Sequence, residues 1–316
     1  MTAGAQRLAD LRAGGKPALA RALTALEAGL DPAGAPDAET AALLDAAVAD
    51  PAGTVIGLTG PPGVGKSTLT GALLARYRAA GLGVGVIAVD PSSQITGGAL
   101  LGDRTRIRTS PEDEQAFVRS LAARDRLGGL SDHAVAAALL MRAVYGRTIV
   151  ETVGIGQSEA DIGLVADTLV LCVQPGSGDS LQFMKAGIME LPDIIVVTKA
   201  DMGAAARRAR ADVEGALGLF AASGGMDWKV PVVALSASSG EGIDDLIGAI
   251  DDHRAWLEQG DRLVRRREKQ ALAFLRDCIR TRHGRAGLQR ILTEITDSDA
   301  AAPFAALSRL VEKLTP

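Results

Sequence analysis

The chain has 316 residues, enough for one large domain or two smaller ones with a full hydrophobic core. Its net charge of −4 argues against nucleic acid as a partner, and its two cysteines, Cys172 and Cys278, argue against a disulfide framework. Because no stretch of about 18 apolar residues and no signal-peptide pattern occurs, we expect a cytoplasmic protein without a membrane span.

Residues 1–50 are expected to form a helical region that does not bind nucleotide. Pro17 suits a first helical turn, and the leucines that follow it recur at helical spacing, at Leu19, Leu23, Leu26 and Leu30. Residues 31–37 contain prolines and a glycine and predict a loop, after which a short helix is expected over 38–48. We interpret the region as a helical collar on the next domain, with an independent binding module as the alternative.

Residues 51–258 are expected to form one α/β domain, because apolar strand-like runs alternate there with helical runs, for example 134–145 and 180–190. This alternation predicts a mostly parallel sheet with helices on both faces and ligands at the carboxyl ends of the strands. The expected strands are 54–59, 84–89, 147–152, 168–173, 193–198 and 231–235.

A glycine-rich loop follows the first of these strands and precedes a helix expected over 67–80. It has the pattern G-x-x-x-x-G-K-S, which in proteins cradles phosphate with backbone N–H groups at a helix N-terminus. Its lysine is expected to reach the β- and γ-phosphates and its serine to bind Mg²⁺. A glycine-rich turn that binds nothing is the alternative, and the flanking strand and helix argue against it. The residues are Gly60-Pro61-Pro62-Gly63-Val64-Gly65-Lys66-Ser67, with Thr68 next.

Acidic and basic residues follow the second strand. Asp90, at its end, is a natural Mg²⁺ partner, although Asp-Pro also starts many turns. Further on, Asp103 is a second candidate for the metal, and Arg104 or Arg106 is a candidate for contacting the γ-phosphate. A solvated charge cluster is the alternative interpretation of this loop.

The third strand ends in Glu151-Thr152-Val153-Gly154. In nucleotide-dependent switches an acid near the metal precedes a glycine amide that senses the γ-phosphate, so Glu151 and Gly154 are candidates for these roles. Gln157 is a candidate for orienting water. The fourth strand is followed by a Gly/Pro-containing loop, in which Asp179 is a good N-cap for a helix that carries Lys185.

Two motifs at the last two strand ends indicate guanine. Thr198-Lys199-Ala200-Asp201 resembles the [NT]-K-x-D motif of GTPases, in which the aspartate accepts the N1–H and N2–H₂ donors of guanine. Ser236-Ala237-Ser238-Ser239-Gly240 is similar to the S-A-x-x-G loop, whose backbone N–H meets guanine O6. Each motif alone is weak, but their order after a phosphate loop favours GTP over ATP.

Residues 259–316 are expected to form a helical arm. The run Arg265-Arg266-Arg267 is interpreted as the solvated face of a helix, with a nucleic-acid patch as the less favoured alternative. Apolar residues recur at helical spacing along the other face and suggest a subunit contact. They include Leu272, Leu275, Ile279, Leu288, Ile291, Phe304, Leu307, Val311 and Leu314.

Taken together, these motifs make the chain resemble the MeaB/ArgK group of P-loop GTPases. The resemblance rests on the loop at 60–68 and on the segments 89–93, 101–106, 150–159 and 187–191, with Glu151-Thr152-Val153-Gly154 in place of the usual D-x-x-G. It implies a homodimeric GTPase that gates adenosylcobalamin loading of methylmalonyl-CoA mutase and protects that enzyme. It also implies Mg²⁺ at Ser67, Asp90, Asp103 and Glu151, and an additional switch from Pro175 to Lys185. The candidate catalytic residues are Lys66, Asp103, Arg106, Glu151, Gln157 and Lys185.

The sequence departs from the group in two places. Residues 119–129 lack the prolines of the R-P-S-P-x-x-G-T-L-G-G segment, and Thr198 replaces the commoner asparagine. Because of these departures, the expected partner is methylmalonyl-CoA mutase or a related acyl-CoA mutase. The alternative functions are a nickel-insertion GTPase, which needs soft or imidazole ligands, and a kinase or ATPase linked to amino-acid transport.

Overall fold

The computed structural model of the protein describes residues 2–29, 35–90, 107, 110, 112–122, 130–152, 159–176, 192–221 and 227–314. Within these residues, seven strands form one parallel sheet in the order β3-β2-β4-β1-β5-β6-β7. This confirms the predicted α/β class. The strands are β1 (Thr54–Thr59), β2 (Val84–Asp90), β3 (Ala116–Ala122), β4 (Arg147–Glu151), β5 (Thr168–Val173), β6 (Ile194–Val197) and β7 (Val232–Ala234).

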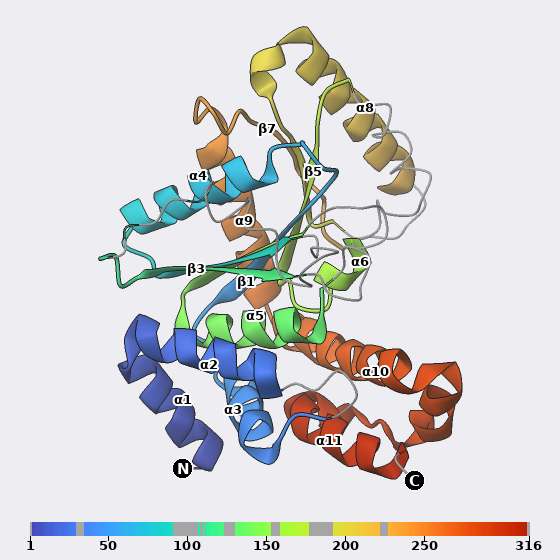
Figure 1. The fold of residues 1–316 in the computed structure, drawn as a ribbon. Helices are drawn as coiled ribbons and strands as arrows, with labels where there is room; N and C mark the ends of the chain where they lie inside the picture. The colour runs from blue at the N-terminus through green and yellow to red at the C-terminus, as the bar shows by residue number, and fades with distance from the viewer. Residues whose placement is uncertain are drawn as a thin grey trace, which may run out of the picture.

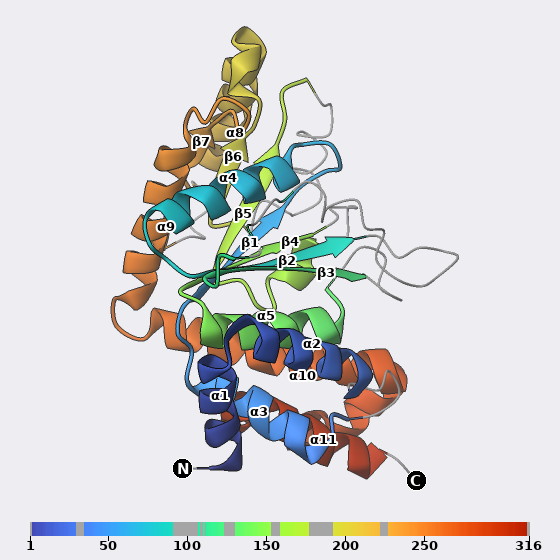
Figure 2. The same ribbon diagram turned by 60° about the vertical axis from the view of Figure 1, so that its left-hand side comes forward.

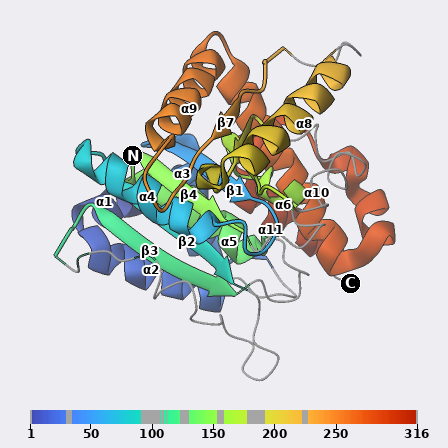
Figure 3. The same ribbon diagram turned by 90° about the horizontal axis from the view of Figure 1, so that it is seen from above.

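Helices cover both faces of the sheet, because successive side chains of each buried strand point to opposite faces. In β1, Ile56 and Leu58 pack with α4 (Lys66–Ala79) and α9 (Ile243–Glu258). Val55, which points to the opposite face, packs with α5 (Asp132–Val144). The short α6 (Glu159–Ile162) and α8 (Ala204–Ala221) also contact the sheet. In Figure 1, α4 lies above the β1–β3 side of the sheet and α5 below it, and Figure 3 shows the same layers from above.

The N-terminal and C-terminal helices lie together below α5 (Figure 2). The N-terminal helices are α1 (Ala3–Ala13), α2 (Gly15–Gly29) and α3 (Ala38–Ala49), and the C-terminal ones are α10 (Arg262–Ile291) and α11 (Pro303–Leu314). α1 packs with α2 and α3, and α3 packs with α11, which in turn packs with α10. The backbone N–H groups of Phe304 and Ala305 donate to the two carboxylate oxygens of Asp45, at 2.9 and 3.0 Å. Three 3₁₀ turns complete the described structure: η2 (Ala200–Met202), η3 (Leu292–Glu294) and η4 (Asp297–Ala301).

The apolar residues of the C-terminal arm are buried against the N-terminal helices of the same chain. Leu275, Ile279, Phe304 and Leu307 belong to one core with leucines of α1–α3, namely Leu8, Leu11, Leu19, Leu23, Leu26 and Leu44. The helical periodicity of the arm therefore reflects packing within the chain. The periodicity is thus no evidence for a subunit contact, and the homodimer stays a prediction.

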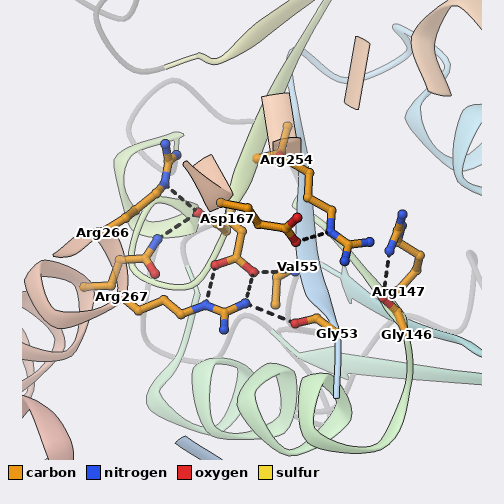
Figure 4. A network of polar contacts seen from close by, with 12 residues as sticks. Gly53, Val55, Gly146, Arg147, Asp167, Arg254, Arg266 and Arg267 are labelled. Atoms are coloured by element: carbon orange, nitrogen blue, oxygen red, sulfur yellow. Dashed lines mark hydrogen bonds and ion pairs between the residues drawn. The ribbon is translucent and has the colours of Figure 1, made fainter. Parts of the chain in front are cut away.

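Two arginines at the start of α10 bind carboxylates beneath the sheet (Figure 4). Arg267 donates to both oxygens of Asp167 at 2.8 Å, and Arg266 donates to both oxygens of Asp193 at 2.9 and 2.6 Å. Only Arg265 has the solvated side chain predicted for the run, with 69% of it exposed. The solvated interpretation is wrong for Arg266 and Arg267, because their side chains are only 25% and 18% exposed and form ion pairs. The sequence does not reveal these pairs, since the acids lie 73 and 100 positions away.

The six predicted strands are present, and the sequence analysis missed one. The missed strand, β3, lies at an edge of the sheet next to β2, and most of its side chains are half-buried. Arg119 and Ser120 interrupt its apolar pattern, which is tolerated at an edge but hides the strand in the sequence. Among the described residues, no helix is long and apolar enough to span a membrane.

Candidate nucleotide-binding site

The glycine-rich loop joins β1 to α4 at the carboxyl edge of the sheet. Gly60 has φ 141°, and a Cβ there would lie 2.2 Å from the carbonyl oxygen of Cys172, so no side chain fits. Gly63 and Gly65 adopt φ 75° and 103°, which favour glycine. Gly65 is the N-cap of α4 and supplies no side-chain hydrogen bond. The first turn of a helix has N–H groups without intrahelical acceptors, so the loop is suited to bind an anion.

The ammonium group of Lys66 lies against this loop. The side chain is 7% exposed, and Nζ donates to the carbonyl oxygens of Gly60 at 2.7 Å and Pro61 at 3.1 Å. A cation in this position lies beside the N–H groups that would bind phosphate. Below the loop, burial raises the pKa of Cys172 to about 12. Cys172 is therefore a neutral core thiol.

Glu151 ends β4, the strand that pairs with β1, and is 3% exposed. Ser67 Oγ donates to Glu151 Oε1 at 2.7 Å, and Thr70 Oγ1 donates to Glu151 Oε2 at 2.8 Å. The structure thus brings together two of the predicted metal ligands. The sequence analysis missed Thr70, which holds the second carboxylate oxygen. The available signal was its position three residues after Ser67, which places both hydroxyls on one side of α4.

The oxygens of Ser67 and Glu151 fit a magnesium ion. Octahedral Mg²⁺ binds oxygen at 2.0–2.1 Å, which puts adjacent ligands about 3 Å apart. The 2.7 Å between Ser67 Oγ and Glu151 Oε1 is close to that separation. Mg²⁺ in nucleotide sites keeps several waters and uses one or two carboxylates plus phosphate, so a small set of protein ligands suffices.

Lys199 joins the predicted guanine end of the site to the phosphate loop. Its backbone is left-handed, at φ 55°, a conformation that no other non-glycine residue adopts in the described part of the chain. Its Nζ donates to the carbonyl oxygen of Gly63 at 3.1 Å and to Gln174 Oε1 at 2.7 Å. The side chain therefore spans from the end of β6 to the loop after β1. Gln174 directly follows β5, and the sequence analysis did not find this contact.

The two motifs at the guanine end are fixed to each other through the backbone. The Ala200 N–H donates to the Leu235 carbonyl oxygen at 3.0 Å, which places the Asp201 turn beside the loop that begins at Ser236. Thr198 is buried, and its Oγ1 donates to the Val173 carbonyl oxygen at 3.1 Å. Asp201 is exposed, as expected for a group that meets a ligand.

In the second motif, the Ser236 and Ser238 hydroxyl oxygens lie 3.1 Å apart. The Ser236 N–H donates to the Glu241 carbonyl oxygen at 2.9 Å, and this bond closes the loop that contains Ala237. The loop therefore has a defined backbone to present to the base.

The remaining candidate residues lie wholly or partly outside the described part of the chain. Asp90 ends β2 and its side chain lies outside the described part, while six further candidates lie entirely outside it. The predicted roles of those six stay predictions: Asp103, Arg104, Arg106, Gly154, Gln157 and Lys185.

A phosphate loop after the first strand and the T-K-A-D and S-A-S-S-G motifs after the last two strands define the fold class as a P-loop GTPase domain. The family of methylmalonyl Co-A mutase-associated GTPases MeaB matches residues 19–286, and the chain belongs to that family.

Named relatives agree with this assignment. A putative GTPase of Pyrococcus abyssi is 46% identical over 220 residues, which are 68% of this chain and 67% of the relative. The GTPase ArgK of Escherichia coli is 38% identical over 279 residues, 86% of this chain and 82% of the relative. The solved structure of a LAO/AO transport system kinase is 28% identical, with a TM-score of 0.68 over 98% of this chain and 97% of the other.

Proposed function

We propose that this protein hydrolyses GTP to GDP and phosphate in a Mg²⁺-dependent reaction, and uses that cycle to gate adenosylcobalamin loading of methylmalonyl-CoA mutase or a related acyl-CoA mutase. The observation that carries the proposal is the Lys199 bridge. It joins the base end of the site to the phosphate loop, beside the Ser67–Glu151 pair. A triphosphate held by the loop thus has its base directed toward Asp201.

The protein's own residues supply binding and charge neutralisation. Backbone N–H groups of 63–67 bind the β- and γ-phosphates, and the Lys66 ammonium neutralises the charge that develops as a water oxygen attacks the γ-phosphorus. The bond between this phosphorus and the β,γ-bridging oxygen breaks, and GDP leaves. Ser67 and Glu151 would hold Mg²⁺, which supplies charge stabilisation on the phosphate oxygens.

Guanine selectivity is assigned to Asp201. Its two carboxylate oxygens accept the N1–H and N2–H₂ donors of guanine together, whereas adenine has neither donor in this arrangement. A site that depends on hydrogen bonds to a ligand rejects an analogue that lacks them, because its own polar groups are then left unpaired. The Lys199 stem would lie along the base, since its ammonium is held by the loop.

The proposed partner follows from the family, whose description names methylmalonyl Co-A mutase association. We further propose a cytoplasmic homodimer with a GTPase domain at 51–258, a helical region at 1–50 and a C-terminal arm at 259–316. The arm is tied to the domain by Arg266 and Arg267. A nickel-insertion function is disfavoured because both thiols are buried and the pKa of Cys172 is raised to about 12.

Turnover of GTP measured with and without the mutase tests this proposal. We expect slow hydrolysis by the protein alone and a clear acceleration when the mutase encoded by the same organism is added, because the partner completes the charge stabilisation around the γ-phosphate. A Lys66→Met variant provides the background rate. A mutase that neither binds the protein nor changes the rate of hydrolysis would contradict the partner, while leaving GTP binding itself to be judged separately.

A further inference from the structure

A cavity of about 470 Å³ lies where α3, α5, α10 and η4 meet, below the sheet. It lies on the side away from the phosphate loop. The carbonyl oxygen of Arg142, a residue that lines the cavity, accepts from the N–H groups of Ala52 and Gly53, just before β1. The six residues of β1 separate this end from the loop at Gly60 by about 20 Å. The cavity is thus distinct from the nucleotide site.

The cavity has apolar walls and a buried cation. Its walls include Val48, Val135, Leu139, Leu164, Phe274 and Pro303. Arg142 is 2% exposed, and its Nε is buried without a hydrogen-bond partner among the described residues. A buried guanidinium without a hydrogen-bonded anion is costly and rare in proteins. Burial lowers the pKa of Arg142 to about 10, so the group stays charged at neutral pH.

Asp167, the acid that interacts with the charge of Arg142, already accepts hydrogen bonds from other residues. Asp167 favours the charged form of Arg142, but both its oxygens accept hydrogen bonds from Arg267, and one also accepts the N–H of Val55 (Figure 4). Of the charged residues that line the cavity, Arg142 and Arg267 are basic, whereas Glu268 and Asp297 are acidic and exposed to solvent.

We propose that this cavity binds a monocarboxylate with an apolar chain of medium length, with the carboxylate on the Arg142 guanidinium and the chain against the apolar wall. A planar carboxylate matches the guanidinium fork and supplies the hydrogen-bonded anion that Arg142 lacks. The volume is in the range of small-molecule pockets. The acids Glu268 and Asp297 disfavour a ligand with several phosphates, so the cavity is not a second nucleotide site.

Isothermal titration of the full-length protein with sodium decanoate tests the proposal. We expect micromolar binding to the natural protein and a loss of affinity of about ten- to a hundredfold in Arg142→Met, because a charge-assisted hydrogen bond is removed. Arg142→Lys should keep part of the affinity. Ala271→Phe, which fills the cavity and leaves Arg142 in place, should abolish binding. 1-Decanol, decyl phosphate and decyltrimethylammonium serve as matched probes of the headgroup and should bind more weakly than decanoate.

A second readout separates binding from folding. Arg142→Met should be no less heat-stable than the natural protein without ligand, because it removes a buried charge that has no hydrogen-bonded partner. Decanoate should raise the Tm of the natural protein and not that of Arg142→Met. The proposal is overturned if decanoate does not bind, if it binds Arg142→Met or Ala271→Phe as tightly as the natural protein, or if decanol or decyl phosphate binds equally well.

Discussion

Replacement of Lys66 by methionine is expected to lower kcat/KM for GTP by about 10²–10³-fold, the cost of removing one group that stabilises transition-state charge. The ammonium group already lies at the phosphate loop, on the carbonyl oxygens of Gly60 and Pro61. Methionine keeps most of the volume of the side chain and removes its charge. Steady-state release of phosphate from GTP, with Mg²⁺ present, measures the effect.

Lys229→Met is the matched control, because Lys229 is exposed and far from the loop in sequence. It should retain the natural rate. Thermal unfolding of both variants shows whether the loop still forms without the hydrogen bonds from Lys66. If Lys66→Met folded normally and hydrolysed GTP at the natural rate, the assignment of this lysine to phosphate would be wrong.

Replacement of Arg267 by methionine is expected to reduce the free energy of unfolding by about 3–5 kcal/mol, the usual cost of leaving one member of a buried ion pair alone. Asp167 is 1% exposed and would lose both hydrogen bonds from the guanidinium, keeping only the N–H of Val55. Arg267 also donates to the Gly53 carbonyl oxygen at 3.0 Å, so the first strand and α10 are both affected (Figure 4). Urea denaturation followed by circular dichroism measures the change.

The neighbouring arginine provides the control for this prediction. Arg265 pairs with Asp261, and both side chains are mostly exposed, at 69% and 60%. Arg265→Met should therefore change the stability by no more than about 0.5 kcal/mol. Adding Asp167→Asn to Arg267→Met should recover part of the loss, because an amide oxygen still accepts the Val55 N–H without a buried charge. Equal effects of the two arginine substitutions would contradict a stabilising Arg267–Asp167 ion pair.

The sequence predicted those parts of the fold and the site that depend on local patterns. A β-branched run before Gly60 and leucines at helical spacing after it specify strand, loop and helix from neighbouring residues alone. The order of motifs along the chain then placed Glu151 and Asp201 at the correct edge, because all strands of a parallel sheet end on the same side. The family resemblance was confirmed by the match over residues 19–286.

What the sequence did not predict depends on contacts between distant segments. The pairing of Arg267 with Asp167 joins residues 100 positions apart, and each residue alone looks like an ordinary surface charge. The bridge from Lys199 to Gly63 spans 136 positions. Similarly, the sequence indicated that the C-terminal arm has an apolar face. Only the three-dimensional structure shows that the N-terminal helices cover this face. Periodicity identifies a buried face and does not identify its partner.

Equilibrium binding of nucleotides tests the central claim most directly: the phosphate loop binds a triphosphate while Asp201 selects guanine. Fluorescent or calorimetric titrations with Mg²⁺ should show GTP binding to the natural protein more tightly than ATP by roughly two orders of magnitude or more. Asp201→Asn should lose GTP and gain xanthosine triphosphate, because the amide N–H₂ donates to the xanthine 2-oxo group while its oxygen accepts N1–H. Equal affinity for ATP, or no measurable binding of guanine nucleotides, would contradict the account.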